Sequence, residues 1–546
     1  MKKIIQLLTL AIILFVGAVS CKKSNFDINN NPNQATDSTI VYNVILPSAQ
    51  NNTARLVARN WGWLQNYLGY WARSGTYAPN TQEETYELTT NFQSQIWTNA
   101  YDNLYDYQIM QLSAKKSGAD FYEGIARIMK AHNYALLVDI YNNVPYSEAL
   151  KGAANTTPKY DEGVDIYADL LRQIDTGLVL ISGADLDAAP NKDIAINDVM
   201  LAGNKVRWSQ FGNTLKLRIL TKFMNGGVDA NLDGSIGTPN SYAPGVDLAA
   251  EFQKIADEGN GFLTTDAEVQ PGYQADKGNP FYNSYVNDNT GTATANSVYF
   301  KANTYAIGYY GYNADDREAR LYKPGSQGFR GVDYGLPALT SNAATTLAGI
   351  GEGLTGTNAN APQRIITAAE SYLLLAECIH RGFVPGDAAA AVNDGINASY
   401  RSLYRIAGFP IDNVQADDDA LAYITFNAGY ADVDYTATEG TNNLAPGGLY
   451  TIISQKWFAL NGLAPYEVWS DYRRVDFAPG TNHFVYGVVT GFIPGPPISV
   501  SPANTKTEIP VRLLYPQTEY NYNPTNVGAE GPIGAYPFSH IFWDIN

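Results

Sequence analysis

Apolar residues recur every three or four positions along several stretches of the N-terminal half, the spacing of one face of an α helix. Two of these stretches, Phe92–Ala114 and Phe121–Tyr141, are separated by a short polar segment at 116–120. Long periodic segments with a short connection predict a helical hairpin. Two more helices are predicted at Gly163–Leu180 and Val206–Met224.

A second hairpin is predicted much later in the chain. The segments Ile365–His380 and Asp387–Leu403 both have helix length, and the turn 381–386 between them contains Gly and Pro. The first arm carries small residues at close spacing, namely Ala368, Ala369 and Ala376. Small residues let helices approach closely, as in tetratricopeptide hairpins of about 34 residues.

Between the hairpins, the segment 226–362 is rich in Gly, Asn and Tyr and has few helical patterns. An irregular stretch of this length in a folded protein is usually functional. We therefore predict a mainly α fold with two parts. A tetratricopeptide-like scaffold occupies 46–225 and 363–475, and an irregular, loop-rich ligand-binding half occupies 226–362 and 476–546.

The N-terminus is organised as an export signal. Two lysines are followed by the apolar run Ile4–Val16 and by small residues up to position 20. The apolar run is too short to span a membrane. Cys21 follows directly, an arrangement that resembles a bacterial lipobox, so we expect cleavage of the signal peptide 1–20 and acylation of Cys21. Several acyl chains would anchor the protein stably. An Asn-rich tether would continue from this anchor over 21–45, ahead of a single body, 46–546.

Composition narrows the possible partners. The chain of 546 residues has 36 Lys and Arg against 53 Asp and Glu, a net charge of −17. This sign is wrong for neutralising phosphates, so we expect no nucleic-acid partner. With two cysteines and four scattered histidines, the chain offers neither a disulfide framework nor zinc-ligand spacing. We expect no required cofactor.

One segment is similar to half of a calcium loop. Asp229, Asn231 and Asp233 place oxygen ligands at alternate positions, and Gly234 follows for the sharp turn. The twelfth position is Asn240 instead of a bidentate Glu. The sequence leaves two alternatives, a weak structural calcium site and a polar turn after the preceding helix.

Aromatic residues are the candidates for ligand binding, since the chain contains 39 Tyr and 8 Trp. One group lies within 61–77, flanked by amide side chains, and a second lies in the irregular segment. Flat rings beside amides suit neutral sugars, which stack through an apolar face and form hydrogen bonds through their hydroxyls. The predicted ligand-binding residues are Trp61, Trp71, Tyr77, Tyr282, Tyr285, Tyr309 and Tyr310. The alternative for the first group is a core-facing helix containing Trp63, Tyr67, Tyr70 and Trp71.

Several segments in order along the chain resemble the SusD/RagB family of nutrient-binding outer-membrane lipoproteins of Bacteroidetes. They are Ile125–Gly152, Ala368–Glu377, Gln455–Arg474 and Ile509–Asn523, together with the leader cysteine. The resemblance implies a cell-surface lipoprotein that binds an oligosaccharide, or a peptide, and delivers it to a TonB-dependent, SusC-like transporter. It also implies a location at the outer membrane, facing the cell exterior.

Two other functions stay open at this stage. The chain has no nucleophile elbow, HExxH pair or phosphate-binding loop, so we expect no catalysis. Pairs of carboxylates are nevertheless plentiful, which leaves a lipid-anchored glycoside hydrolase as one alternative. A peptide-binding tetratricopeptide scaffold is the other. The rings do not distinguish starch, chitin, mannan or a glycoprotein sugar.

Overall fold

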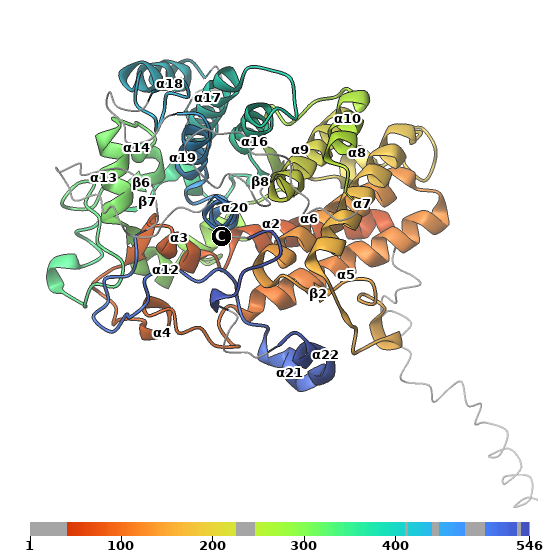
Figure 1. Ribbon diagram of the computed structural model, residues 1–546, viewed down its shortest axis with the longest axis horizontal. Coiled ribbons are helices and arrows are strands. Elements are labelled where there is room, and N and C mark those ends of the chain that lie inside the picture. The colour runs from red at the N-terminus through yellow and green to blue at the C-terminus, as the bar shows by residue number, and fades with distance from the viewer. Residues whose placement is uncertain are drawn as a thin grey trace, which may run out of the picture. The chain divides into compact units, whose positions relative to one another are not determined.

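The computed structural model describes most of the chain from residue 41 onward (Figure 1). The described residues are 41–224, 246–409, 413–438, 447–475, 497–531 and 537–544. Cys21 and the possible calcium ligands Asp229, Asn231 and Asp233 lie outside these ranges. Residues from Tyr42 onward form one compact unit, whose first helix begins inside the segment that the sequence predicts as a tether.

Helices dominate the fold, as predicted. The longer helices are α2 (Tyr42–Ala58), α5 (Ser94–Ser117), α6 (Asp120–Tyr141), α7 (Gly163–Gly183), α9 (Lys205–Phe223), α10 (Leu248–Glu258), α16 (Ala368–His380), α17 (Ala388–Ile406), α18 (Val414–Phe426), α19 (Leu449–Leu460) and α20 (Pro465–Arg474). The shorter ones are α3 (Gly62–Tyr67), α4 (Thr81–Glu84), α8 (Ile194–Asn197), α11 (Pro280–Tyr285), α12 (Ala295–Tyr299), α13 (Thr304–Tyr312), α14 (Glu318–Leu321), α15 (Glu352–Thr355), α21 (Gln517–Tyr522) and α22 (Pro524–Ala529), with 3₁₀ turns at Gly152–Ala154 and Thr340–Asn342.

The predicted N-terminal hairpin is confirmed as α5 and α6, and α7 packs against α6 (Figure 1). Gly118 ends α5 in the left-handed conformation, at φ +67°. Helices α6 and α7 approach closely where two glycines meet. A Cβ at Gly177 would lie 2.8 Å from the carbonyl oxygen of Gly124, so a larger residue there would push the two helices apart.

The second predicted hairpin is confirmed as α16 and α17, which pack against each other. A Cβ at Gly395 would lie 2.8 Å from Leu373, so these helices are also closely packed. Helix α9 contacts both α7 and α16 and thereby links the two hairpins. Helix α16 begins at Ala368, three positions later than Ile365, because residues 363–366 form a strand.

Outside the long helices, the described chain forms short helices and two-stranded antiparallel sheets. The strands are β1 (Trp71–Arg73), β2 (Val144–Pro145), β3 (Tyr160–Asp161), β4 (Ala267–Val269), β5 (Phe300–Ala302), β6 (Tyr322–Lys323), β7 (Gly349–Ile350) and β8 (Gln363–Ile366), paired as β1–β5, β2–β3, β4–β8 and β6–β7. Helix α3 ends at Tyr67, so Trp71 does not extend the helical face of Trp63 and Tyr67 but begins β1 instead.

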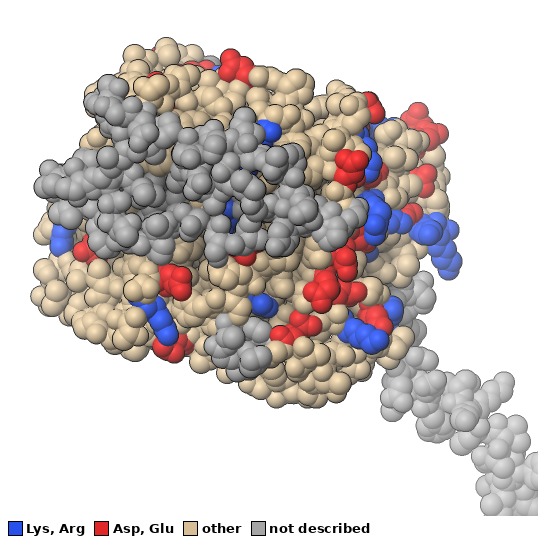
Figure 2. All heavy atoms as spheres, in the orientation of Figure 1, with Lys and Arg blue, Asp and Glu red and all other residues tan. Residues whose placement is uncertain are grey.

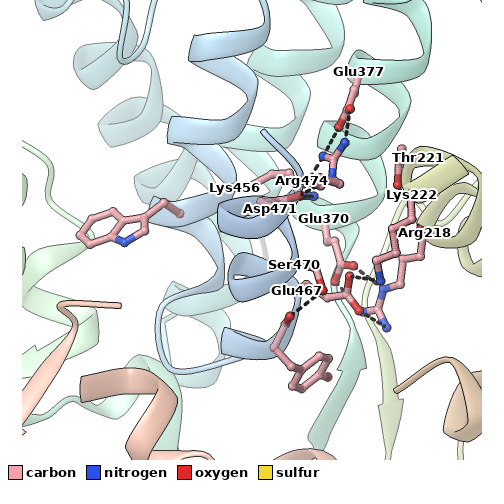
Figure 3. Close-up of polar contacts among 12 residues, drawn as sticks. Arg218, Thr221, Lys222, Glu370, Glu377, Lys456, Glu467, Ser470, Asp471 and Arg474 are labelled. Atoms are coloured by element: carbon pink, nitrogen blue, oxygen red, sulfur yellow. Dashed lines mark hydrogen bonds and ion pairs between the residues drawn. The ribbon is translucent and has the colours of Figure 1, made fainter. Parts of the chain in front are cut away.

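A network of buried ion pairs joins α9, α16, α19 and α20 (Figure 3). Arg474 donates from Nη1 and Nη2 to the two carboxylate oxygens of Glu377, at 2.6 Å each. Arg218 forms a similar forked pair with Glu370. On the face drawn in Figure 2, the described Lys and Arg side chains are interspersed with Asp and Glu. Of the helices in the described ranges, none combines the length and the apolar character needed to cross a bilayer.

Candidate functional site

Five of the seven predicted ligand-binding rings lie in the hydrophobic core, where they are between 0 and 4% exposed. They are Trp61, Trp71, Tyr285, Tyr309 and Tyr310. A ring without an exposed face has none to offer a sugar. These five residues are therefore core residues, and assigning them to the ligand was an error of the sequence interpretation.

Trp71 and Tyr285 belong to one buried cluster. The Trp71 ring lies 5.1 Å from Tyr285 and 5.5 Å from Phe300, measured between ring centroids. The Tyr285 hydroxyl lies close to the backbone at Trp61 and Gly62. The Trp61 indole N–H donates to the carbonyl oxygen of Leu56 at 2.8 Å.

Tyr309 and Tyr310 belong to a second buried cluster, against helix α19. The Tyr310 hydroxyl donates to the carbonyl oxygen of Phe458 at 3.0 Å and accepts from the side-chain amide of Asn461 at 3.1 Å. The Tyr309 ring lies 5.4 Å from the half-buried Trp457. The two hydrogen bonds pair the Tyr310 hydroxyl, which burial removes from water.

Two predicted rings, Tyr77 and Tyr282, remain half-exposed. Tyr77 lies beside a further half-exposed ring, Tyr299, with centroids 5.2 Å apart and planes inclined at 60°. The exposed Asn80 lies near Tyr299, and its side-chain amide donates to a carboxylate oxygen of Glu83 at 3.2 Å. We call Tyr77, Asn80 and Tyr299 the tyrosine ledge. Tyr282 lies on α11, where its hydroxyl accepts from Asn287 at 3.5 Å.

The tyrosine ledge is held by buried contacts beneath it. Arg73 donates from Nη1 to the carbonyl oxygen of Tyr77 at 2.6 Å and forms an ion pair with Glu84, also at 2.6 Å. The backbone N–H of Gly75 donates to Asn342 at 2.7 Å, which closes the turn before Tyr77. Burial, reinforced by the nearby Glu83 and Glu84 carboxylates, raises the pKa of Tyr299. Its hydroxyl therefore stays protonated and can donate a hydrogen bond at neutral pH.

Tyr299 belongs to the second aromatic group but was not among the predicted ligand-binding residues, because only tertiary structure brings it to Tyr77. Strand β5 pairs with β1 so that Phe300 lies opposite Arg73, and this register places the preceding residue near the turn after β1. More than 200 residues separate the two rings along the chain. A signal was nevertheless present, since Tyr299 lies within a β-branched and aromatic run, 298–300, whose last residue begins β5.

Within the described ranges, His, Cys, Asp and Glu form no group of three or more that could hold a metal ion. The possible calcium motif lies outside those ranges, so the calcium site stays a prediction. The structure provides polar, aromatic surface at the tyrosine ledge, an arrangement suited to binding by stacking and hydrogen bonding.

Comparison with known proteins places the chain in a family. A SusD-like family model, described as "Starch-binding associating with outer membrane", matches residues 29–234 and 242–516. No curated protein matches by sequence.

Similar solved structures share the fold at low identity. A SusD homologue from Bacteroides fragilis is 19% identical, with a TM-score of 0.69, and the match covers 92% of this chain and 99% of that one. A SusD/RagB family protein from Bacteroides thetaiotaomicron is 20% identical, with a TM-score of 0.66 and coverage of 93% and 99%. A chitin-binding SusD homologue from Flavobacterium johnsoniae is 19% identical, with a TM-score of 0.63 and coverage of 92% and 99%. With a family match over most of its length, this chain belongs to the SusD-like family.

Proposed function

We propose that the protein binds an oligosaccharide nutrient at the outer surface of the outer membrane and performs no catalysis. The family description names starch binding and association with the outer membrane, and two solved relatives are named as chitin-binding. Both descriptions favour a carbohydrate over a peptide.

The tyrosine ledge is the observation that carries the proposal. Tyr77 and Tyr299 present two half-exposed rings, inclined to each other, with an amide side chain beside them. A sugar ring has an apolar face that can stack on such a ring, and its hydroxyls can pair with the amide of Asn80 and the tyrosine hydroxyls. Because stacking tolerates many sugars, the ledge suits a neutral glycan without specifying which one.

The anchor and the partner are further parts of the proposal. Acylation at Cys21 would hold the protein at the membrane. By its family resemblance, the protein would deliver the bound oligosaccharide to a TonB-dependent, SusC-like transporter. Recovery of such a transporter with the wild-type protein after mild detergent extraction is the expected result. Its absence from repeated extractions would contradict this part.

The ledge is tested by isothermal titration with maltooligosaccharides and chitooligosaccharides. Tyr77→Ala should weaken binding by about 1–3 kcal/mol, the usual value of one buried apolar side chain, which is roughly 5- to 150-fold in Kd. Tyr522→Ala is the matched control, because Tyr522 is 75% exposed and lies on helix α21, outside the tyrosine ledge. Equal binding by the two variants, or no binding of either glycan class by the wild type, would contradict the proposal.

The glycoside-hydrolase alternative makes an opposite prediction. Any glycan that binds in the titration should be recovered intact after long incubation with the protein. Shorter products that disappear on neutralising one Asp or Glu would establish catalysis and overturn the proposal of a binding protein.

A further inference from the structure

A cavity of about 400 Å³ lies in the helical scaffold, between the beginning of α9, the loop that leads into β4, and one face each of α16 and α17. Helix α16 packs against both α9 and α17, and Figure 1 shows the three helices as neighbours. No residue of the tyrosine ledge lines this cavity. It is therefore a separate place on the described part of the chain where a ligand could bind.

The wall of the cavity is held together by Asp266. Its carboxylate accepts from the backbone N–H of Ala368 on α16 at 2.9 Å and from the Ser402 hydroxyl on α17 at 2.5 Å. Arg405 donates from Nη2 to Asp266 and Glu268, at 3.2 and 2.6 Å. Because these groups already have partners, we assign them to the wall and not to ligand recognition. The wall is thus formed before any ligand arrives.

The other two arginines at the cavity also have partners. Arg401 donates to both carboxylate oxygens of Asp417, at 2.5 and 2.9 Å. Arg207 donates from Nη2 to the backbone carbonyl oxygen of Asp266 at 2.8 Å. Paired arginines leave little positive charge to attract an anionic ligand.

Of the carboxylates that line the cavity, Asp394 alone has no ion pair with a described residue. Burial raises the pKa of Asp394, and the charge of Arg401 opposes this effect. The positive charge near Asp394 also reduces its attraction for a cationic ligand. The balance of charges therefore favours a neutral ligand with polar groups.

Three polar side chains are free to make contacts with such a ligand. Tyr372, Asp394 and Asn397 line the cavity, and their side chains form no hydrogen bond with any residue that the structure describes. Asp394 is exposed, and the other two are half-exposed. Asn397 follows Asp394 by three positions, so both lie on one face of α17, and Tyr372 on α16 is close enough for Asp394 to act on its pKa.

Together these side chains can donate and accept. Burial and the Asp394 carboxylate raise the pKa of Tyr372, so its hydroxyl keeps its proton and can donate. The Asp394 carboxylate accepts hydrogen bonds, and the amide of Asn397 does both. Hydroxyl groups, which also donate and accept, match this combination.

We propose that this cavity is a second binding site, for a neutral saccharide of one or two sugar rings. Sugar hydroxyls would donate to Asp394 and to the amide oxygen of Asn397, and would accept from the Tyr372 hydroxyl. The half-exposed Tyr372 ring would contact the C–H groups of the sugar. The site does not require the tyrosine ledge to bind a glycan.

The size of the cavity and its opposite wall agree with this class of ligand. The volume lies in the lower part of the range of about 300–1,000 Å³ that is typical of small-molecule sites. A long oligosaccharide would therefore place only one end in it. The exposed Thr264 and Thr265 also line the cavity and add hydroxyls for further hydrogen bonds with the sugar.

The test is titration calorimetry of the full chain with maltose and N,N′-diacetylchitobiose, and with D-glucuronate and D-glucosamine as charged probes. Tyr77→Ala, which weakens the ledge, should still bind at least one of the two disaccharides. Adding Asp394→Ala or Asn397→Ala should weaken this binding about fivefold or more, the expected effect of losing one hydrogen bond. Asn393→Ala is the matched control, because Asn393 is exposed on α17 and does not line the cavity.

The two site variants should melt like their parent, because neither side chain has a hydrogen bond to a described residue. Failure of the wild type to bind either disaccharide would overturn the inference. So would loss of all disaccharide binding in Tyr77→Ala, or binding in that protein that neither Asp394→Ala nor Asn397→Ala weakens. Tighter binding of either charged probe than of both disaccharides would show that the cavity selects charge, and would also overturn it.

Failure of the proposed function has a different signature. Disaccharide binding that Asp394→Ala weakens, together with longer glycans that bind Tyr77→Ala as tightly as the wild type, would remove the ledge and keep the cavity. Longer glycans that bind through Tyr77, without any disaccharide binding that depends on Asp394, would do the opposite.

Discussion

Glu377→Gln removes one charge from an ion pair buried between α16 and α20. The side chains of Glu377 and Arg474 are 0 and 1% exposed, and two parallel hydrogen bonds of 2.6 Å join them. Glutamine keeps the shape of the side chain but turns one acceptor into a donor facing the guanidinium. Arg474 is then left with one buried carboxylate partner, Asp471, at 2.8 Å.

Removing one member of a buried ion pair typically costs about 3–5 kcal/mol, because the other charge stays buried without its partner. Since Arg474 keeps Asp471, we expect a loss near the lower end, about 3 kcal/mol. Urea denaturation followed by tryptophan fluorescence measures it. The control is Asp417→Asn, which breaks the exposed pair with Arg401 and should cost about 1 kcal/mol or less. Equal losses for the two variants would refute the reasoning.

The Glu377–Arg474 pair also predicts how the stability of the protein depends on pH. Burial alone would raise the pKa of Glu377, but Arg474 and Arg381 hold it well below its usual value of 4.5. The folded protein thus binds fewer protons at this group than the unfolded chain does. The stability that Glu377 contributes is fully present above pH 4.5 and is lost as the pH falls below it. The difference in the free energy of unfolding between the wild type and Glu377→Gln should therefore shrink as the pH falls below 4.5.

Other substitutions test packing and anchoring. Gly177→Ala should cost about 1–3 kcal/mol, because its Cβ would meet Gly124, whereas Gly183→Ala on the same helix meets nothing and should be neutral or stabilising; equal midpoints in urea would contradict this. Tyr310→Ala should lower the melting temperature sharply, because the ring and its hydroxyl are buried. A normal melting temperature together with lost glycan binding would show instead that Tyr310 binds the ligand. Cys21→Ser should move the protein from the membrane to the soluble fraction at any ionic strength, and persistent fatty-acid labelling would contradict acylation at Cys21.

The helices that were predicted from the sequence each span enough turns for their apolar period to show, whereas α2 begins in the segment that the sequence predicts as a tether and α10 lies in the segment predicted as irregular chain. Helices α5, α6, α7 and α9 begin and end within a few residues of the predicted limits. The start of α16 was not predictable, because residues 363–366 form a strand that pairs with Ala267–Val269, a segment far away in the sequence. Such pairing leaves little trace in a local pattern.

The candidate site was predicted less well, since abundance of rings says little about exposure. Helix α13 has nine residues, of which four are tyrosines, and it is too short for a period to separate core from surface. Tyr309 and Tyr310 are buried, whereas Tyr312 is 40% exposed. Tyr309 and Tyr310 are buried because they pack against helix α19, and the position of α19 is a property of the tertiary fold.

The buried ion pairs are a second feature that the local sequence pattern does not reveal. Charged residues make up only 16% of the sequence, yet several lie in the core between helices. Glu370 and Glu377 are seven residues apart, so they lie on one face of α16, where the first pairs with α9 through Arg218 and the second with α20 through Arg474. Apolar side chains could supply comparable stability at these positions, but a forked ion pair requires one alignment of its two helices. The network therefore fixes how α9 and α20 sit on α16.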